Sequence, residues 1–227
     1  MCKMLELAVF LLCLLPMTSA GGLADKVLLF PQKTDDSYVK ITPEKPLNLT
    51  AFTLCMRVAT EQQGQRDMFV FSYRIPDMND LRVWIEKDKT IALYISRANS
   101  RVYFNLPPLS NFLTHLCFTW SSLTGHTAAW MNGQRSIYRK YGIGCAVRPG
   151  GAVVLGQNPY ELLGGFDAEQ SFVGEITDVN LWDEVLPAKE IKGVYANTAT
   201  VKMPNVINWR TAEYDKQGIV EVIQEDF

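Results

Sequence analysis

Short apolar runs separated by turn-forming residues fill most of this chain, and this pattern constrains the fold more than any other feature. Each run is about 5–8 residues long, the usual length of a β-strand. The Asn132-Gly133 pair is a strong signal for a two-residue hairpin turn. Such a density of strands without intervening helices predicts an all-β sandwich or jelly roll. The runs are FTLCMRV (52–58), MFVFSY (68–73), LRVWI (81–85), TIALYIS (90–96), RVYFNL (101–106), THLCFTW (114–120) and TAAWM (127–131).

One short helix is expected after Pro187, a good first-turn residue, through AKEIKGVYAN (188–197). Ile191, Val194 and Tyr195 fall on one side of it, although Gly193 weakens it. A length of 227 residues with 48% hydrophobic residues supports a single domain with its own core. The net charge of −2 leaves no basic excess that would indicate nucleic-acid binding.

The N-terminus predicts the compartment. Residues 1–20 combine an early lysine, an apolar stretch and small residues that end at Ala20, which is typical of a secretory signal peptide. Since no later segment holds about 18 consecutive apolar residues, we expect a secreted domain over 21–227 without a membrane anchor. Cys2 and Cys13 leave with the signal. Cys55, Cys117 and Cys145 remain. Outside the cell two of these three can form a disulfide, which leaves one unpaired.

The stretch HLCFTWSS (115–122) carries a histidine, a cysteine and a tryptophan within six residues. In a strand, His115 and Cys117 point one way, while Leu116, Phe118 and Trp120 point the other way, into the core. A metal at His115 and Cys117 would need further ligands, yet His126 is the only other histidine and no Cys-x-x-Cys pair exists. A catalytic cysteine is disfavoured because a disulfide would consume the thiol. A structural role in the core is favoured.

This stretch resembles the pentraxin family, whose pattern is His-x-Cys-x-Ser/Thr-Trp-x-Ser/Thr. AFTLCMR around Cys55, VVLGQ (153–157), GGFDAEQSFVGEITDVNLWD (164–183) and VINWR (206–210) are also similar to family segments, in order, between Lys26 and Val220. The resemblance implies a two-sheet antiparallel jelly-roll sandwich (concanavalin-like) with a Cys55–Cys117 disulfide. A disulfide that closes a loop of about 60 residues would contribute roughly 4 kcal/mol in the chain-entropy model.

The resemblance also implies a function. Members of this family are soluble recognition proteins of innate immunity that form cyclic homo-oligomers, typically pentamers. They bind phosphocholine-like or carbohydrate ligands through calcium. Partners implied for this chain are therefore microbial or damaged-cell surfaces, with complement components by analogy.

Two segments are expected to supply the calcium ligands, because Ca²⁺ prefers 6–8 oxygen ligands and loops present them well. In the first, Met78 separates Asp77 from Asn79, whereas the family has an Asp followed directly by an Asn; Asp80 is an alternative ligand. In the second segment, Asn158 and Tyr160 stand where similar members have acidic residues, and Glu161 could compensate. Fewer carboxylates predict weakened calcium binding. The predicted metal ligands are Asp77, Asn79, Asn158, Asp167 and Gln170.

The ligand pocket implied by the resemblance is also altered. Trp84 falls near the family's apolar patch, and an aromatic face can hold a quaternary cation. The carboxylate that would face choline falls on Arg101. A cation would then face a cation, which favours a phosphate monoester or a sugar over phosphocholine. The alternative is that Arg101 is an exposed charge at the end of a strand.

Two further positions carry predictions. Asn48-Leu49-Thr50 is a glycosylation sequon, used only if that edge is exposed. Cys145 has no evident partner, so it is either a buried free thiol or a link between subunits.

Three classes of function compete. A secreted calcium-dependent recognition protein is favoured, and a calcium-independent adhesion or scaffold module on the same fold is the alternative. A glycoside hydrolase needs two carboxylates across one bond, but a regular strand would send Glu175 and Asp178 to opposite faces. The sequence therefore predicts that this chain is not an enzyme.

Overall fold

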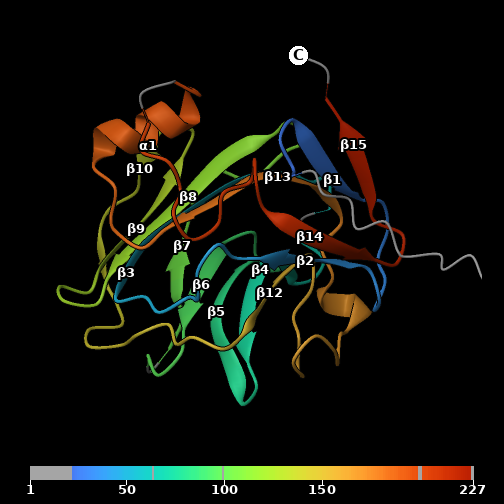
Figure 1. Cartoon of the computed structure of the whole chain (residues 1–227), viewed down its shortest axis with the longest axis horizontal. Coiled ribbons are helices and arrows are strands. Elements are labelled where there is room, and N and C mark those ends of the chain that lie inside the picture. Colours follow the sequence, from blue (N-terminus) through green and yellow to red (C-terminus); the bar gives the residue numbers. More distant parts are fainter. Residues whose placement is uncertain (1–21, 63, 99, 199–200, 226–227) are drawn as a thin grey trace, which may run out of the picture.

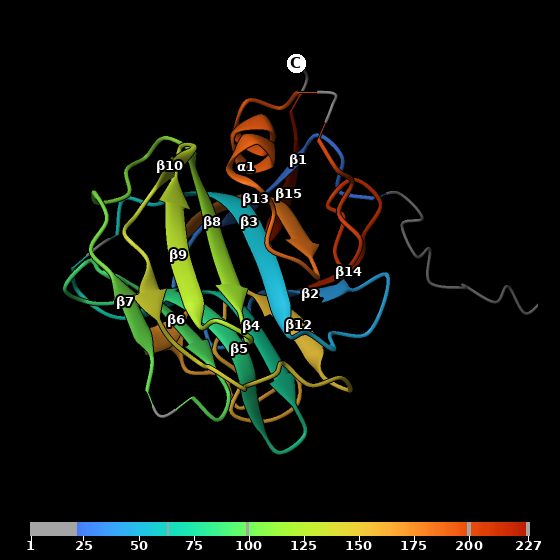
Figure 2. The ribbon, with the colours of Figure 1, turned by 90° about the vertical axis from the view of Figure 1, so that its left-hand side faces the viewer.

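Two antiparallel sheets packed face to face make up the computed structural model of this chain (Figures 1 and 2). It describes residues 22–62, 64–98, 100–198 and 201–225, so the predicted signal peptide and its cleavage site lie outside the described residues. The predicted all-β jelly-roll sandwich with one short helix is confirmed. Within the described ranges, no helix is both long enough and apolar enough to cross a bilayer.

The first sheet has the strand order β10-β9-β8-β3-β13-β1-β15, with β11 also paired to β9. Figure 2 shows several of these strands side by side, with the helix α1 above them. Its strands are β1 (Lys26–Phe30), β3 (Ala51–Ala59), β8 (Thr114–Ser121), β9 (His126–Met131), β10 (Gln134–Arg135), β11 (Arg139–Lys140), β13 (Gly174–Trp182) and β15 (Glu221–Gln224).

The second sheet has the strand order β14-β2-β12-β4-β5-β6-β7. A short 3-10 helix, η1 (Ala168–Gln170), follows β12. The strands are β2 (Tyr38–Thr42), β4 (Met68–Ile75), β5 (Met78–Ile85), β6 (Ile91–Ile95), β7 (Val102–Phe104), β12 (Ala152–Leu155) and β14 (Glu213–Gln217).

Each run expected to be a strand contains one, although only Val102–Phe104 of the run at 101–106 is a strand, and the hairpin prediction is confirmed. Asn132 and Gly133 have φ angles of 49° and 75° and connect β9 to β10. Two successive positive φ angles are the geometry of the type I′ turn, which matches the twist of a hairpin. The apolar sides of the two sheets face each other, so Leu116, Phe118 and Trp120 lie in the core as predicted.

The outer face of the first sheet is covered by α1 (Ala188–Tyr195), which begins directly after Pro187 as expected. Leu186 and Ile191 pack on Trp130, Trp182 and the cysteines, so β8 is buried on both faces. The sequence reasoning assigned only one apolar face to this strand, because the cover comes from residues about 70 positions later in the chain.

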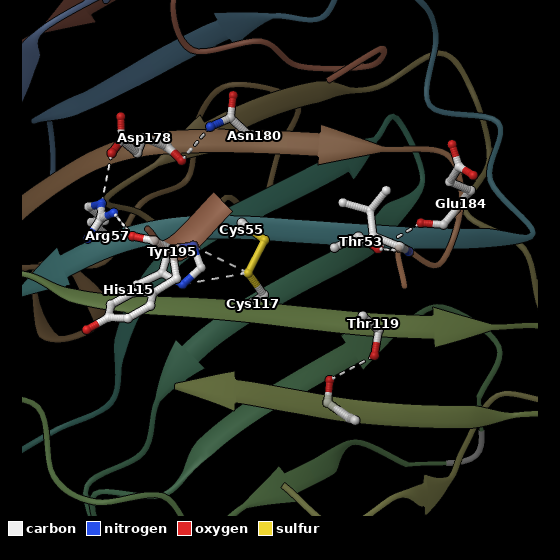
Figure 3. The surroundings of a disulfide bond; sticks show 12 residues. Thr53, Cys55, Arg57, His115, Cys117, Thr119, Asp178, Asn180, Glu184 and Tyr195 are labelled. Atoms are coloured by element: carbon white, nitrogen blue, oxygen red, sulfur yellow. Dashed lines mark hydrogen bonds and ion pairs between the residues drawn. A yellow bond between two sulfur atoms is a disulfide. The ribbon is translucent and has the colours of Figure 1, made fainter. Parts of the chain in front are cut away.

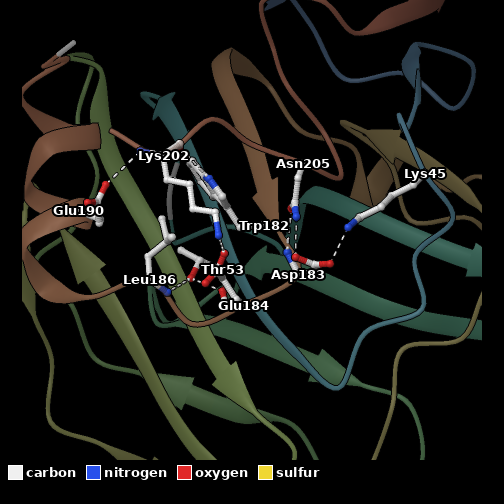
Figure 4. Close-up of polar contacts among 9 residues, drawn as sticks. All are labelled: Lys45, Thr53, Trp182, Asp183, Glu184, Leu186, Glu190, Lys202 and Asn205. Atoms are coloured by element: carbon white, nitrogen blue, oxygen red, sulfur yellow. Dashed lines mark hydrogen bonds and ion pairs between the residues drawn. The ribbon is translucent and has the colours of Figure 1, made fainter. Parts of the chain in front are cut away.

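Polar contacts attach this cover to the sheet (Figure 4). The Thr53 hydroxyl donates to the Glu184 carbonyl at 2.8 Å and accepts from the Leu186 amide at 2.8 Å. The Lys45 ammonium lies 2.5 Å from the Asp183 carboxylate. This hydrogen bond is the main reason that the pKa of Asp183 is lowered. The chain leaving β13 is therefore held by both buried and exposed polar groups.

Candidate functional site

The first predicted calcium segment is a tight hairpin rather than a loop. Ile75 pairs with Met78 across a two-residue turn, so residues 78–80 belong to β5. Asp77 is exposed at the tip of this turn. Asn79 is half-buried and pairs with Arg74, and its side-chain oxygen is buried without a hydrogen-bond partner among the described residues. Asn79 thus offers a free acceptor oxygen, whereas Asp77 extends into solvent.

Asp80, the alternative ligand, is engaged elsewhere. It is fully buried and lies at a bulge between β4 and β5. Its Oδ1 accepts from Arg148 Nη2 at 2.6 Å, and its Oδ2 accepts from the Arg148 amide at 2.5 Å. Both oxygens of Asp80 are therefore committed to a buried ion pair that ties β5 to the chain before β12.

The second predicted segment brings its residues together. Asn158 Nδ2 donates to Gln170 Oε1 at 2.5 Å, and Gln170 Nε2 donates to the Tyr160 hydroxyl at 2.7 Å. Gln170 Nε2 also lies 3.5 Å from Asp167 Oδ2. Asp167 caps η1, because its Oδ1 accepts from the Glu169 amide at 2.9 Å. These four oxygen-bearing side chains form one polar cluster, named here the Asn158 cluster.

Glu161 is exposed in the turn that this segment makes. Its backbone exchanges hydrogen bonds with Gly164, and no side-chain contact joins it to Asn158 or Gln170 among the described residues. The structure therefore gives no support to Glu161 as a replacement for the missing acidic residues.

Arg82 is the residue that the sequence reasoning missed. It lies on β5, pairs across the sheet with Ser72, and donates from Nη1 to Asn158 Oδ1 at 3.2 Å. The Arg82 guanidinium therefore occupies Asn158 Oδ1, the same oxygen that a metal ion bound to Asn158 would use. The alternation of LRVWI places Arg82 and Trp84 on one face of the strand, which was the signal available in the sequence.

Trp84 lies beneath this guanidinium and is only 1% exposed. It stacks on Phe69 with ring centroids 5.1 Å apart, and its indole N–H donates to Glu86 Oε1 at 2.9 Å. Arg101 lies over the same indole at 5.6 Å and 3.7 Å from the Glu86 carboxylate. The aromatic surface predicted for a ligand is thus covered by two of the chain's own cations.

The oxygen donors fit a calcium site of low affinity. The Asn158 cluster supplies one carboxylate, two amide oxygens and a hydroxyl, which are hard donors of the kind that Ca²⁺ prefers. The buried oxygen of Asn79, without a partner among the described residues, lies on β5, the strand that also carries Arg82. Opposing this, Asp167 is the only carboxylate in the cluster, and Arg82 places a positive charge against Asn158. Affinity for calcium rises with ligand charge, so this donor set predicts weak binding.

The stretch around His115 forms a structural site under α1 (Figure 3). Cys55 and Cys117 are bonded to each other, which confirms the disulfide that the resemblance implied. His115 Nε2 lies 3.5 Å from Cys117 Sγ, and its ring packs against Tyr195. Burial, with a smaller effect of Arg57, lowers the pKa of His115 to about 3. The three residues lie close enough to suggest a metal site, but the sulfurs of a disulfide are not thiolate ligands.

The remaining predicted positions lie apart from this site. Asn48 and Thr50 are exposed immediately before β3, so the sequon is accessible. Cys145 is a half-buried free cysteine that packs against the main core.

The fold and its polar cluster define a two-sheet antiparallel sandwich with oxygen donors gathered beside the second sheet. The model of the Pentaxin family matches residues 26–224, and the chain belongs to this family, the pentraxins. It is 48% identical to the C-reactive protein of Danio rerio over 223 residues, 96% of this chain and 99% of that protein. It is 33% identical to the C-reactive protein of Homo sapiens over 217 residues, 92% of this chain and 95% of that protein.

A solved structure shares the fold. The native heptameric SAP-like pentraxin of Limulus polyphemus superimposes with a TM-score of 0.77 at 21% identity, over 89% of this chain and 96% of that chain.

Proposed function

We propose that this chain is a secreted pattern-recognition protein of innate immunity. It binds phosphate-bearing or carbohydrate ligands on the outer face of the second sheet, over strands β4 to β7, named here the β4–β7 sheet. One observation carries the proposal: Arg82 donates to Asn158 of the Asn158 cluster, and Arg82 and Arg101 both lie over the Trp84 ring on that face. Family membership supports recognition as the general role.

Calcium is proposed as the cofactor, held by Asp167, Gln170 and Asn158, with Asn79 on β5 as a further proposed ligand. When bound, the ion would supply a positive charge for oxygens of the ligand. Asn158 must then exchange its hydrogen bond with Arg82 for the metal. We therefore expect calcium to bind measurably but weakly. Asp77 remains a proposed ligand only if the turn at residues 76–77 folds inward.

The ligand class follows from the charges around Trp84. Arg82 and Arg101 both lie over its ring at 5.6 Å, so a quaternary ammonium would meet two guanidinium groups there. Like charges in this position disfavour phosphocholine. A phosphate monoester or a hydroxyl-rich sugar meets no such repulsion, and surfaces of microbes or damaged cells display both.

A cyclic homo-oligomer is proposed as the assembly. One edge of the molecule, at β9–β11, is basic and exposes Ile137, Tyr138 and Ile143. The opposite edge, at β14 and β15, exposes Glu213, Asp215 and Glu221. Complementary patches at opposite edges form a head-to-tail interface that closes into a ring when the rotation permits.

An effector partner such as a complement component is proposed on the other sheet. A cavity of about 610 Å³ lies there between β13, α1 and the segment that ends at Arg210, away from the Asn158 cluster. Ligand and effector would then bind opposite faces of the sandwich.

The second candidate is a calcium-independent adhesion or scaffold module. The Arg82–Asn158 hydrogen bond favours it, since the cluster is satisfied without a metal. An enzymatic role is not proposed: Asp178, one of the two acids weighed for hydrolysis, is bound by Arg57 at 2.9 Å.

Calcium titration of the EDTA-treated secreted protein, followed by thermal unfolding, tests the calcium proposal. A ligand that binds only the folded state stabilises it by about 2.7 kcal/mol at 100 times its dissociation constant. We expect a saturable rise in melting temperature with calcium and none with magnesium. Asp167→Asn should abolish the rise, because it removes the only carboxylate of the cluster.

Asp35→Asn is the matched control, since Asp35 is an exposed aspartate outside the cluster. A calcium response that Asp167→Asn and Asp35→Asn share would place the metal elsewhere. No response at millimolar calcium in the parent protein would favour the calcium-independent module.

A further inference from the structure

We infer that Arg82 and Arg101 form an anion subsite that binds a phosphate monoester without calcium. This inference rests on the proposed function, because it concerns the same face of the β4–β7 sheet. It differs in assigning the charge that attracts the ligand to the chain itself instead of to a bound metal.

Arg82 is held in place by three aromatic rings and by Asn158. Its guanidinium carbon lies 4.7 Å from the centroid of Tyr94, 5.6 Å from that of Phe69 and 5.6 Å from that of Trp84. Three rings thus surround one cation, and desolvated cation–π contacts are among the stronger ones. With Nη1 fixed on Asn158, the group is preorganised, so little conformational entropy is lost when an anion binds.

Arg82 and Arg74 each have a guanidinium nitrogen without a partner among the described residues. Nε of Arg82 and Nε of Arg74 are both buried without a hydrogen-bond partner among the described residues. Unpaired buried charge is costly, and an oxyanion bound here would offset part of this cost.

A second cation, Arg101, lies at the exposed edge of this aromatic surface. Arg101 is exposed, belongs to the connection before β7, and lies over the Trp84 ring at 5.6 Å. Glu86 lies 3.7 Å from Arg101 and accepts from the Trp84 indole, and Asp67 lies beside Glu86. These two carboxylates face three arginines (74, 82 and 101), which leaves a net positive charge.

A phosphate monoester suits this arrangement. It is doubly charged near neutral pH and offers three oxygens, whereas a guanidinium supplies donors in a fixed fork. An ammonium or choline group would be repelled. Arg82 and calcium compete for the same oxygen of Asn158, so calcium should release Arg82 from this hydrogen bond. Calcium should therefore not increase the affinity of the Arg82 subsite for phosphate.

Calorimetric titration with methyl phosphate tests this inference, because this probe carries no cation of its own. The secreted protein is titrated in excess EDTA and again in calcium, with phosphocholine as the contrast. We expect methyl phosphate to bind in EDTA. Arg82→Gln should weaken this binding about tenfold or more, the usual cost of losing a charge-assisted hydrogen bond.

Arg101→Gln is the second variant, since an exposed arginine can be replaced without disturbing the sheet; it should weaken binding as well. Arg210→Gln is the matched control, because it removes an exposed arginine on the other side of the sandwich. Its affinity should equal that of the parent.

The outcomes separate the two proposals. Binding that requires calcium would overturn the anion subsite while supporting the proposed function. Binding in EDTA that Arg82→Gln and Arg101→Gln leave unchanged would also overturn the subsite. Absence of binding in both media would count against phosphate recognition as a whole.

Discussion

His115 is one of two histidines in the chain, and the fold removes its ring almost completely from water. It is 1% exposed, beneath Tyr195 and beside the disulfide. Arg57, which donates to the Tyr195 carbonyl at 2.7 Å, adds a positive charge nearby. An imidazolium would be penalised by both effects, so the folded protein keeps this histidine neutral.

Stability should therefore fall with acid through this one residue. The pKa of His115 is about 3 in the folded protein, compared with about 6.5 in an unfolded chain. Between these values the unfolded state binds the additional proton, so its free energy is lowered as the pH falls. We expect the free energy of unfolding to decrease by about 1.4 kcal/mol per pH unit below pH ~6.5 from this residue. Urea unfolding across this range measures the decrease.

His115→Gln should flatten the pH dependence in this window. His126→Gln is the matched control, because His126 is exposed at the start of β9. The parent slope should persist in the control. A parent-like slope in His115→Gln would show that other groups cause the acid sensitivity.

Arg82 shows what sequence reasoning at the level of residues could not supply. Asp167 and Gln170 could be predicted because they match the family pattern, and Asn158 because it takes the place of an acidic residue of that pattern; the fold does bring the three together. The contact between Arg82 and Asn158 joins residues 76 positions apart and depends on the sheet register. Likewise, Asp80 was an open alternative until Arg148 was seen to occupy both of its oxygens.

At the level of elements, periodicity predicted the interior strands better than the outer ones. The β3, β5 and β8 strands have strong apolar patterns because they face the core. The edge strands β14 and β15 are mostly exposed, so no apolar pattern distinguished them. The segment at residues 76–80 was expected to be a loop because of its polar residues, but pairing of Met78 with Ile75 makes it a hairpin.

The disulfide joins two of these interior strands. Cys55 on β3 lies directly opposite Cys117 on β8, 62 residues later in the chain. Because the sheet already pairs these positions, the bond acts mainly on the unfolded chain. In the chain-entropy model, closing such a loop contributes about 4 kcal/mol.

We expect the Cys55→Ala/Cys117→Ala double variant to lose about 4 kcal/mol of unfolding free energy in urea. Its fold should persist at low temperature, since the backbone pairing of β3 and β8 remains. Cys145→Ala is the control, because this cysteine is free and only half-buried. A loss in the double variant no larger than that in the control would show that the bond contributes little.

At the scale of the whole molecule, the proposed functions fall on separate surfaces of the sandwich. The β4–β7 face carries the cations and the Asn158 cluster, whereas α1 and its cavity cover the other sheet. The edges at β9–β11 and at β14 and β15 remain for contacts between subunits of the proposed oligomer. Figure 2 shows β9 and β10 at one side of the molecule and β14 at the other, so a ring of subunits would leave both faces free.

Charge reversal at one edge should therefore dissociate the proposed oligomer. Arg139 and Lys140 are exposed on β11, beside Ile137 and Tyr138. In Arg139→Glu/Lys140→Glu this edge would repel the acidic edge at β14 of the next subunit, because like charges that face each other suppress association. Sedimentation velocity should show a defined oligomer for the parent protein and mainly monomer for this variant.

Lys87→Glu/Lys89→Glu is the matched control, since it makes the same charge change at the exposed turn between β5 and β6. This control should sediment like the parent. A ring that survives reversal at β11 but not at the β5–β6 turn would place the interface on the proposed ligand face. The ligand site would then be shared between subunits or covered by them, and the assignment of separate surfaces to ligand and neighbour would have to be abandoned.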